Sequence, residues 1–149
     1  MNEALSSKIL DVLGRQHLMT IATIRSDGYP QATTVNYIHD NDFTLYFATD
    51  TVSQKAGNIA VNNKVSVAIV DRARDFYKLR GLSLSGTAAR IRAKDKTEEI
   101  ALRLFRALPQ SRRFVPGDPH SLAVYAITPV AIALVDYASG YGTTYLVEL

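Results

Sequence analysis

Cysteine and tryptophan are both absent from the 149-residue sequence. The lack of cysteine excludes disulfide bonds, thiolate metal ligands and thiol catalysis, and nothing indicates an oxidising compartment. No run approaches the roughly 18 apolar residues of a membrane-spanning helix. The first residues, Met1-Asn2-Glu3, lack the basic and apolar stretches of a signal peptide. We therefore expect a cytoplasmic protein with no membrane partner.

Common catalytic motifs are also missing. The sequence contains no Gly-x-Ser-x-Gly, no phosphate loop ending in Gly-Lys-Ser/Thr, no Gly-x-Gly-x-x-Gly and no His-Glu-x-x-His. His17, His39 and His120 lie far apart along the chain, so their spacing indicates no metal site. We assign no catalytic residue and no metal from the sequence.

Charge is present in both signs. The net charge of +3 would favour an anionic ligand or a nucleic acid if it were gathered on one face. Basic residues instead alternate with Asp71 and Asp75 in one segment and run into Asp95, Glu98 and Glu99 in another. This pattern is typical of a solvated surface of mixed charge, and we expect no nucleic-acid partner.

Hydrophobic periodicity predicts a helix followed by antiparallel strands. Residues 3–13 carry apolar side chains at helical spacing, with Asn2 as the cap and Gly14 at the end. Strand patterns follow at 18–24, 31–38 and 43–48, and the short polar segments between them predict tight turns. The first three strands therefore form a meander.

Helices and strands alternate in the rest of the chain. We expect a loop entering a short helix over 49–63, strands at 65–70 and 82–91, and then a helix that Asp95 caps, with Glu98 completing a capping box. An apolar stripe of Ile100, Leu104 and Leu108 marks that helix, and Pro109 follows it. The final elements are two strands, 122–127 and 130–137, separated by Thr128-Pro129, and a turn at 139–142.

This order favours a mainly β protein, a small antiparallel β-barrel with peripheral helices that forms one domain over 1–149. Closure into a barrel removes the exposed edges of an open sheet. A doubly wound parallel sheet is excluded because the first turns are too short for crossover connections.

One segment has the character of an anion site. Residues 45–56 lead from a strand end through hydroxyl residues into a helix start. Helix N-termini favour anions, and Thr49, Ser53 and Lys55 add donors and a positive charge. The residues alone leave two interpretations open: a phosphate site, or an ordinary N-cap in which Thr51 or Ser53 serves only the helix.

Several short motifs follow one another along nearly the whole chain: Asp27-Gly28-x-Pro30, Thr33-Thr34-Val35-Asn36-Tyr37, Leu45-Tyr46-Phe47-Ala48-Thr49, Ser53-x-Lys55-Ala56, Asn63-x-Val65-Ser66-Val67, Leu79-Arg80-Gly81-Leu82 with Gly86-x-Ala88, and Asp136-Tyr137-x-x-Gly140-Tyr141-Gly142. In this order and spacing the chain resembles the pyridoxamine 5′-phosphate oxidase-like family of FMN-binding split barrels. The resemblance implies an FMN-dependent oxidoreductase.

The resemblance also implies where the cofactor binds. The flavin phosphate is expected at Ala48, Thr49, Ser53, Gln54 and Lys55. The edge of the isoalloxazine ring is expected along Thr33, Thr34, Val35 and Asn36, with Thr34 and Asn36 facing it more than Val35. A homodimer is implied, with two flavin sites in its interface and with contributions to each site from Leu82, Ser83 and Tyr141 of the other subunit.

Two departures from the family pattern bear on the ligand. Thr33 stands where larger members commonly have arginine, and Gln54 stands where they have a second basic residue. Two consequences stay open: the phosphate is bound more weakly, or another arginine such as Arg80 or a residue of the partner chain compensates. Members that oxidise vitamin B6 carry a carboxy-terminal extension with tryptophan and arginine, whereas this chain has no tryptophan and ends at Leu149. We therefore expect another small-molecule substrate or electron donor.

Three alternatives stay open. A deazaflavin would present a phosphate to Lys55 as FMN does. The protein would also fit the family as a flavin-binding stress or sensor protein without turnover. A haem-handling split barrel would use His39 or His120.

Overall fold

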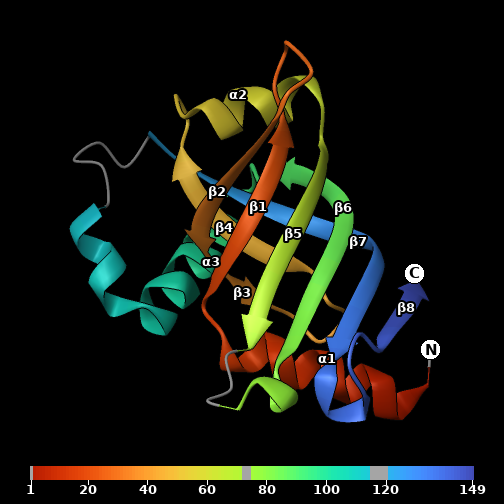
Figure 1. The fold of residues 1–149 in the computed structure, drawn as a ribbon. Helices are drawn as coiled ribbons and strands as arrows, with labels where there is room; N and C mark the ends of the chain where they lie inside the picture. Colours follow the sequence, from red (N-terminus) through yellow and green to blue (C-terminus); the bar gives the residue numbers. More distant parts are fainter. Residues whose placement is uncertain (1, 72–74, 115–120) are drawn as a thin grey trace.

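The computed structural model describes residues 2–71, 75–114 and 121–149. In this part of the chain an eight-stranded antiparallel sheet curls into a half-barrel, accompanied by three α-helices (Figure 1). The sequence-based expectation of a mainly β split barrel is confirmed.

The helices are α1 (Glu3–Arg15), α2 (Gln54–Val61) and α3 (Lys94–Ala107). The strands are β1 (Leu18–Ile24), β2 (Pro30–Asn36), β3 (Ile38–His39), β4 (Leu45–Asp50), β5 (Lys64–Asp71), β6 (Arg80–Arg90), β7 (Leu122–Asp136) and β8 (Thr144–Glu148). Short 3-10 turns lie at Phe76–Lys78, Pro109–Phe114 and Tyr137–Ser139. The sheet order is β2-β1-β5-β6-β7-β4-β3, and β8 also pairs with β7.

Two helices cover opposite ends of the half-barrel. At one end α1 begins at Asn2, whose side chain accepts a hydrogen bond from the Ala4 amide as predicted, and it buries Ile9, Val12 and Leu13 in the core. At the other end α2 packs beside β1, and the turn between β1 and β2 extends past it (Figure 1). The main core lies between these helices, inside the curved sheet.

The strand predicted after the first hairpin corresponds to β4, and it begins later than predicted. We expected it at 43–48, but β4 starts at Leu45. Phe43 has a φ of 67°, in the left-handed region that ends extended backbone, and its amide donates to the Asp40 carbonyl in a turn. Because its side chain is buried in the core, packing holds a conformation that the period-two pattern does not predict.

The expected break at Thr128-Pro129 does not occur, and β7 runs continuously for 15 residues. Proline lacks an amide donor and is tolerated in sheets at bulges. Here the register with β6 shifts between Ser85 and Gly86, so that Gly86 faces Pro129. On its other side β7 pairs with β4 up to Ile127 and with β8 from Ala131. Pro129 therefore lies at a bulge between these two partners.

Helix α3 forms as predicted, but with a different start. Its N-cap is Ala93, which provides no side-chain hydrogen bond, and Asp95 lies inside the first turn. The Thr97 hydroxyl bonds instead to the carbonyls of Ile91 and Ala93. The expected capping box of Asp95 and Glu98 is therefore wrong, because the helix begins at Lys94 and Asp95 already lies inside it.

An ion pair holds α3 against the sheet. Arg103 contacts the Asp40 carboxylate at 2.8 Å, and the Tyr46 hydroxyl donates to the same carboxylate at 2.9 Å. Partial burial opposes the ionisation of Asp40, but these two hydrogen bonds outweigh it and hold the pKa of Asp40 below its ordinary value. Burial and the bond to Asp40 raise the pKa of Tyr46 to about 12. Together with Ile100 and Leu104, which pack against Tyr46 and Val124, these contacts place α3 beside β4.

Gly86 and Gly57 provide a matched test of this architecture. A Cβ atom at Gly86 would lie 2.5 Å from the Thr128 carbonyl oxygen, whereas one at Gly57 in α2 would meet nothing within 4 Å. Gly86→Ala should lower the free energy of unfolding by about 1–3 kcal/mol, the usual cost of overpacking. Gly57→Ala should raise it by about 0.5–1 kcal/mol. Urea unfolding measures both, and equal stability of the two variants would contradict the bulge.

Candidate functional site

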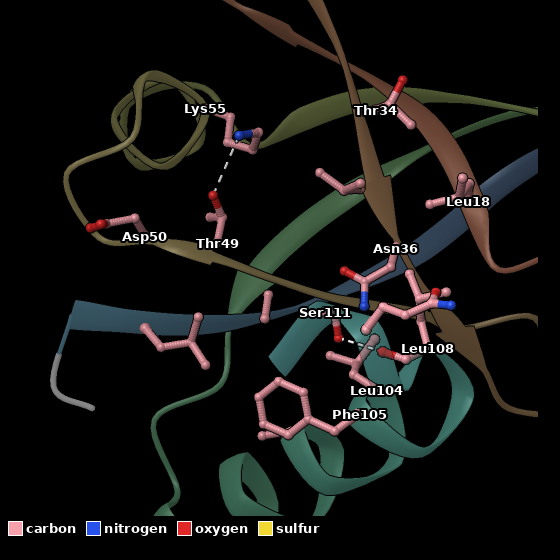
Figure 2. A pocket seen from close by; sticks show the side chains of 15 residues that line it. Leu18, Thr34, Asn36, Thr49, Asp50, Lys55, Leu104, Phe105, Leu108 and Ser111 are labelled. Carbon is pink, nitrogen blue, oxygen red and sulfur yellow. Dashed lines mark hydrogen bonds between the residues drawn. The ribbon is translucent and has the colours of Figure 1, made fainter. Parts of the chain in front are cut away.

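A cleft of about 610 Å³ lies along the split between β2 and β4 (Figure 2). These strands are in contact, yet none of the strand pairs in the described chain joins them. Helices α2 and α3 border the cleft on two further sides. The lining residues are Leu18, Thr34, Val35, Asn36, Ala48, Thr49, Asp50, Lys55, Ala101, Leu104, Phe105, Leu108, Gln110, Ser111 and Leu122.

Three polar side chains meet where β4 leads into α2. The Lys55 Nζ atom donates to the Thr49 hydroxyl at 3.4 Å, as Figure 2 shows, and that hydroxyl lies 3.0 Å from the Ser53 hydroxyl. Either hydroxyl can donate the shared proton, and the other then keeps an O–H for a ligand. Lys55 and Thr49 line the cleft. This corner of the cleft therefore offers a positive charge and the Thr49 hydroxyl to an anion, and Ser53 contacts that hydroxyl from outside the cleft lining.

Local hydrogen bonds make the turn between β4 and α2. The Asp50 carboxylate accepts from the Val52 amide, and the Asp50 carbonyl accepts from the Ser53 amide. Ser53 then caps α2 through a bond from the Ala56 amide to its hydroxyl. Ser53 thus acts as the N-cap and also contacts Thr49, so the structure contains features of both interpretations that the sequence left open.

Strand β2 forms a second wall. Thr34, Val35 and Asn36 line the cleft, as expected for a ligand-facing strand. Thr34 is exposed, whereas Val35 packs partly against the core. Thr33 does not line the cleft. It pairs with Ile21 and faces the interior, where its Oγ1 is buried without a hydrogen-bond partner among the described residues.

The third wall comes from α3 and was missed by the sequence reasoning. Leu104, Phe105 and Leu108 point toward the cleft in Figure 2. Leu104 and Leu108 were interpreted as the core stripe of an amphipathic helix, and the spacing contains no signal for a cleft. Asp50 was also missed, although it lies directly between two predicted site residues, Thr49 and Ser53.

Several predicted site residues lie outside the cleft lining. Gln54 is exposed and its side chain bonds to Gln31. Leu82 is only 4% exposed and packs in the main core, and its expected contribution to a partner's flavin site stays a prediction. Ser83 is exposed on the outer face of β6. Tyr141 is 82% exposed, with its ring 5.3 Å from that of Tyr137.

Arg80 does not supply a second positive charge to the cleft. Its guanidinium contacts the carboxylates of Asp71 at 2.6 Å and Asp11 at 2.8 Å, and its side chain is 19% exposed. The positive charge of Arg80 is therefore already paired with two carboxylates. These groups lie near α1 and the end of β5. The proposed compensation by Arg80 is therefore wrong, and Lys55 is the cationic residue among those that line the cleft.

His17 and His39 lie in a different region. His17 and His39 line a smaller hollow of about 310 Å³ between α1 and α3, together with Arg103 and Arg106. His120 lies outside the described residues. Within residues 2–71, 75–114 and 121–149, no group of three or more His, Asp or Glu side chains is arranged to hold a metal ion. The helices described there are too short or too polar to span a membrane.

Sequence comparison decides the family. The family model described as pyridoxamine 5′-phosphate oxidase matches residues 5–136. The chain belongs to this family. The match includes β2, β4 and α2, and therefore the polar corner and the β2 wall of the cleft. No curated protein sequence matches the chain significantly.

Several solved structures share this fold. The chain is similar to a pyridoxamine 5′-phosphate oxidase-like protein of Listeria innocua, with 24% identity and a TM-score of 0.71 over 88% of this chain and 98% of that one. General Stress Protein 26 of Bacillus anthracis str. Sterne is 22% identical, with a TM-score of 0.74 over 97% of this chain and 98% of the other. A heme binding protein of Mycobacterium smegmatis is 17% identical, with a TM-score of 0.82; the match covers 99% of this chain but 59% of that protein. At these identities the likeness establishes the fold.

The capping role of Ser53 can be tested apart from any ligand. Ser53→Ala should lower the free energy of unfolding by about 0.5–2 kcal/mol, the usual cost of losing an N-cap. Ser53→Asp keeps a capping oxygen and should recover most of this loss. Chemical denaturation of the ligand-free protein measures both variants, and an unchanged stability of Ser53→Ala would show that the cap contributes little.

Proposed function

We propose that this protein binds FMN in the cleft and acts as a flavin-dependent oxidoreductase on a small molecule. The observation that carries the proposal is the polar corner, where Lys55, Thr49 and Ser53 meet at the N-terminus of α2. A phosphate monoester suits this corner because backbone amides, hydroxyls and one ammonium group all favour an anion there.

The remaining cleft fits the rest of the cofactor. The whole cleft has a volume of about 610 Å³, which lies within the range of roughly 300–1,000 Å³ common for small-molecule sites. Beyond the polar corner, Thr34 and Asn36 offer polar groups along β2, and Leu104, Phe105 and Leu108 offer apolar surface on α3. A flavin has matching parts: a phosphate, a ring edge with hydrogen-bonding atoms, and an apolar ring edge.

The chain's own residues bind and orient in this proposal. Lys55 with Thr49 would hold the phosphate, and β2 would align the ring between Thr34 and Asn36. When bound, FMN supplies the capacity to transfer hydride or single electrons. A deazaflavin with a phosphate would use the same polar corner.

The phosphate contact has a direct test. Lys55→Met removes the positive charge and keeps the length of the side chain. A charge-assisted hydrogen bond is worth about 1.5–3 kcal/mol, so FMN should bind roughly tenfold to a hundredfold more weakly. Riboflavin, which lacks the phosphate, should bind the variant and the wild-type protein equally. Fluorescence titration measures both affinities.

Lys64→Met is the matched control. Lys64 is exposed at the start of β5 and does not line the cleft. This substitution removes the same charge and should change the FMN affinity by less than about twofold, since exposed charges at a distance are screened. Equal losses in the two variants would show that Lys55 acts only through net charge.

The proposal includes a homodimer with flavin at the subunit interface. The outer face of the sheet supports it. Ala68, Ser83, Ala133 and Leu146 lie side by side across β5, β6, β7 and β8, and Leu146 is 67% exposed. Small and apolar side chains in a row make a flat surface that a second copy can cover, and twofold dimers are the most common closed assembly.

Sedimentation of the FMN-loaded protein tests the dimer. The expected species has about twice the chain mass of 16.4 kDa. Ser83→Arg places a charged side chain on the proposed interface and should shift the protein toward monomer with loss of bound flavin. Asn41→Arg, in the exposed turn before β4, should leave both unchanged. A wild-type monomer with full flavin occupancy would contradict the shared site.

Haem binding is the second candidate function. It is favoured by the fold similarity to the heme binding protein of Mycobacterium smegmatis and by the position of His39 in the hollow between α1 and α3. The absorption spectrum of the purified protein separates the two candidates, because a flavin and a haem have different bands. A Soret band that disappears in His39→Ala, with no flavin bands, would favour haem.

A further inference from the structure

A chain of side-chain amides connects α2 to the hairpin of β1 and β2. The Asn58 side-chain NH₂ donates to the Thr23 hydroxyl at 2.9 Å and to the Gln31 side-chain oxygen at 3.2 Å. The Gln31 NH₂ then donates to the Gln54 side-chain oxygen at 2.7 Å. We call these four residues, Thr23, Gln31, Gln54 and Asn58, the amide clamp.

The inner part of the amide clamp is buried. Thr23 is 1% exposed and Asn58 is 8% exposed, whereas Gln54 lies at the surface. Thr23 and Gln31 are directly opposite each other on β1 and β2, so both face α2. Buried polar groups are costly to leave unpaired. The clamp therefore favours one arrangement of α2 over alternatives that break it.

Helix α2 needs such an attachment. It has eight residues and contains Gly57, and helices this short are marginal without tertiary contacts. Its buried apolar side chains are Ala56 and Ile59, of which Ala56 is small. Apolar packing alone thus leaves the rotation of the helix about its own axis weakly determined.

The amide clamp determines that rotation. Gln54 and Asn58 are four residues apart and lie on the same face of α2. Successive side chains are separated by about 100° around a helix, so fixing this face also fixes the direction of Lys55. Lys55 is thereby directed into the cleft toward Thr49.

We infer that Gln31, Gln54 and Asn58 are positioning residues that preorganise the anion site formed by Lys55, Thr49 and Ser53. This inference rests on the proposed function, because it concerns the same phosphate site. It also gives Gln54 a role different from the ligand contact that the family resemblance implied. A preorganised site binds more tightly because less ordering is required when the ligand arrives.

The test compares two ligands that differ only in the phosphate. In Asn58→Ala and in Gln31→Leu, FMN should bind about tenfold more weakly, which corresponds to the loss of one or two hydrogen bonds. Riboflavin affinity should stay within about twofold of the wild-type value, since neither Gln31 nor Asn58 lines the cleft and the ring wall is formed by Thr34, Val35 and Asn36. Gln31 lies nearer the surface than Asn58, so Gln31→Leu still tests the inference if Asn58→Ala folds poorly.

Two variants serve as matched controls. Asn62→Ala removes an asparagine that accepts from the Lys64 amide at the other end of α2. Gln16→Leu removes a side-chain amide that contacts Asp71, outside the cleft lining. Both should leave the ratio of FMN to riboflavin affinity unchanged. If riboflavin affinity falls in parallel with FMN affinity in the clamp variants, the clamp is only structural and the inference is overturned.

Amide hydrogen exchange in the ligand-free protein gives an independent readout. Exchange of the amides at 53–57 should accelerate in both clamp variants and not in Gln16→Leu. Unchanged exchange at these amides would overturn the positioning role of the amide clamp, and it would leave the proposed phosphate site standing. A wild-type protein that binds FMN no better than riboflavin would overturn the proposed phosphate site itself, and with it this role of the clamp.

Discussion

The curvature of the long β6–β7 pair determines where the cleft can form. At the bulge, Gly86 approaches Thr128 so closely that no side chain fits between them. The same point lies between the two partners of β7, since β4 pairs before it and β8 pairs after it. This arrangement carries β4 around the half-barrel until it meets β2 without pairing. The split that results is the cleft.

Two helices complete the walls of the cleft that forms at this split. The polar end is made locally, because the turn after β4 leads into the N-cap Ser53 within a few residues. The apolar end is made by a distant segment, since α3 is held beside β4 by the ion pair of Arg103 with Asp40 and by packing on Tyr46. The cleft therefore separates charge at one end from apolar surface at the other, which is the requirement of a phosphorylated, planar ligand.

Local patterns predicted most of the fold. The helices over 3–13 and after residue 94, the first hairpin and the Ser53 helix start were found because periodicity and capping residues are short-range signals. The continuity of β7 through Pro129 was missed because a bulge depends on the neighbouring strands. The α3 wall and the amide clamp were missed for the same reason: Asn58 meets Thr23 and Gln31 only after α2 has docked on the hairpin. The meeting of Thr49, Ser53 and Lys55 could be predicted because these residues are close in sequence.

The most direct test of this account is a crystal structure of the protein grown with FMN. The account predicts the phosphate within about 3.2 Å of Lys55 Nζ, at hydrogen-bonding distance, and the ring between β2 and the α3 wall. FMN bound in the hollow between α1 and α3, or a cleft without FMN at a saturating concentration, would contradict it.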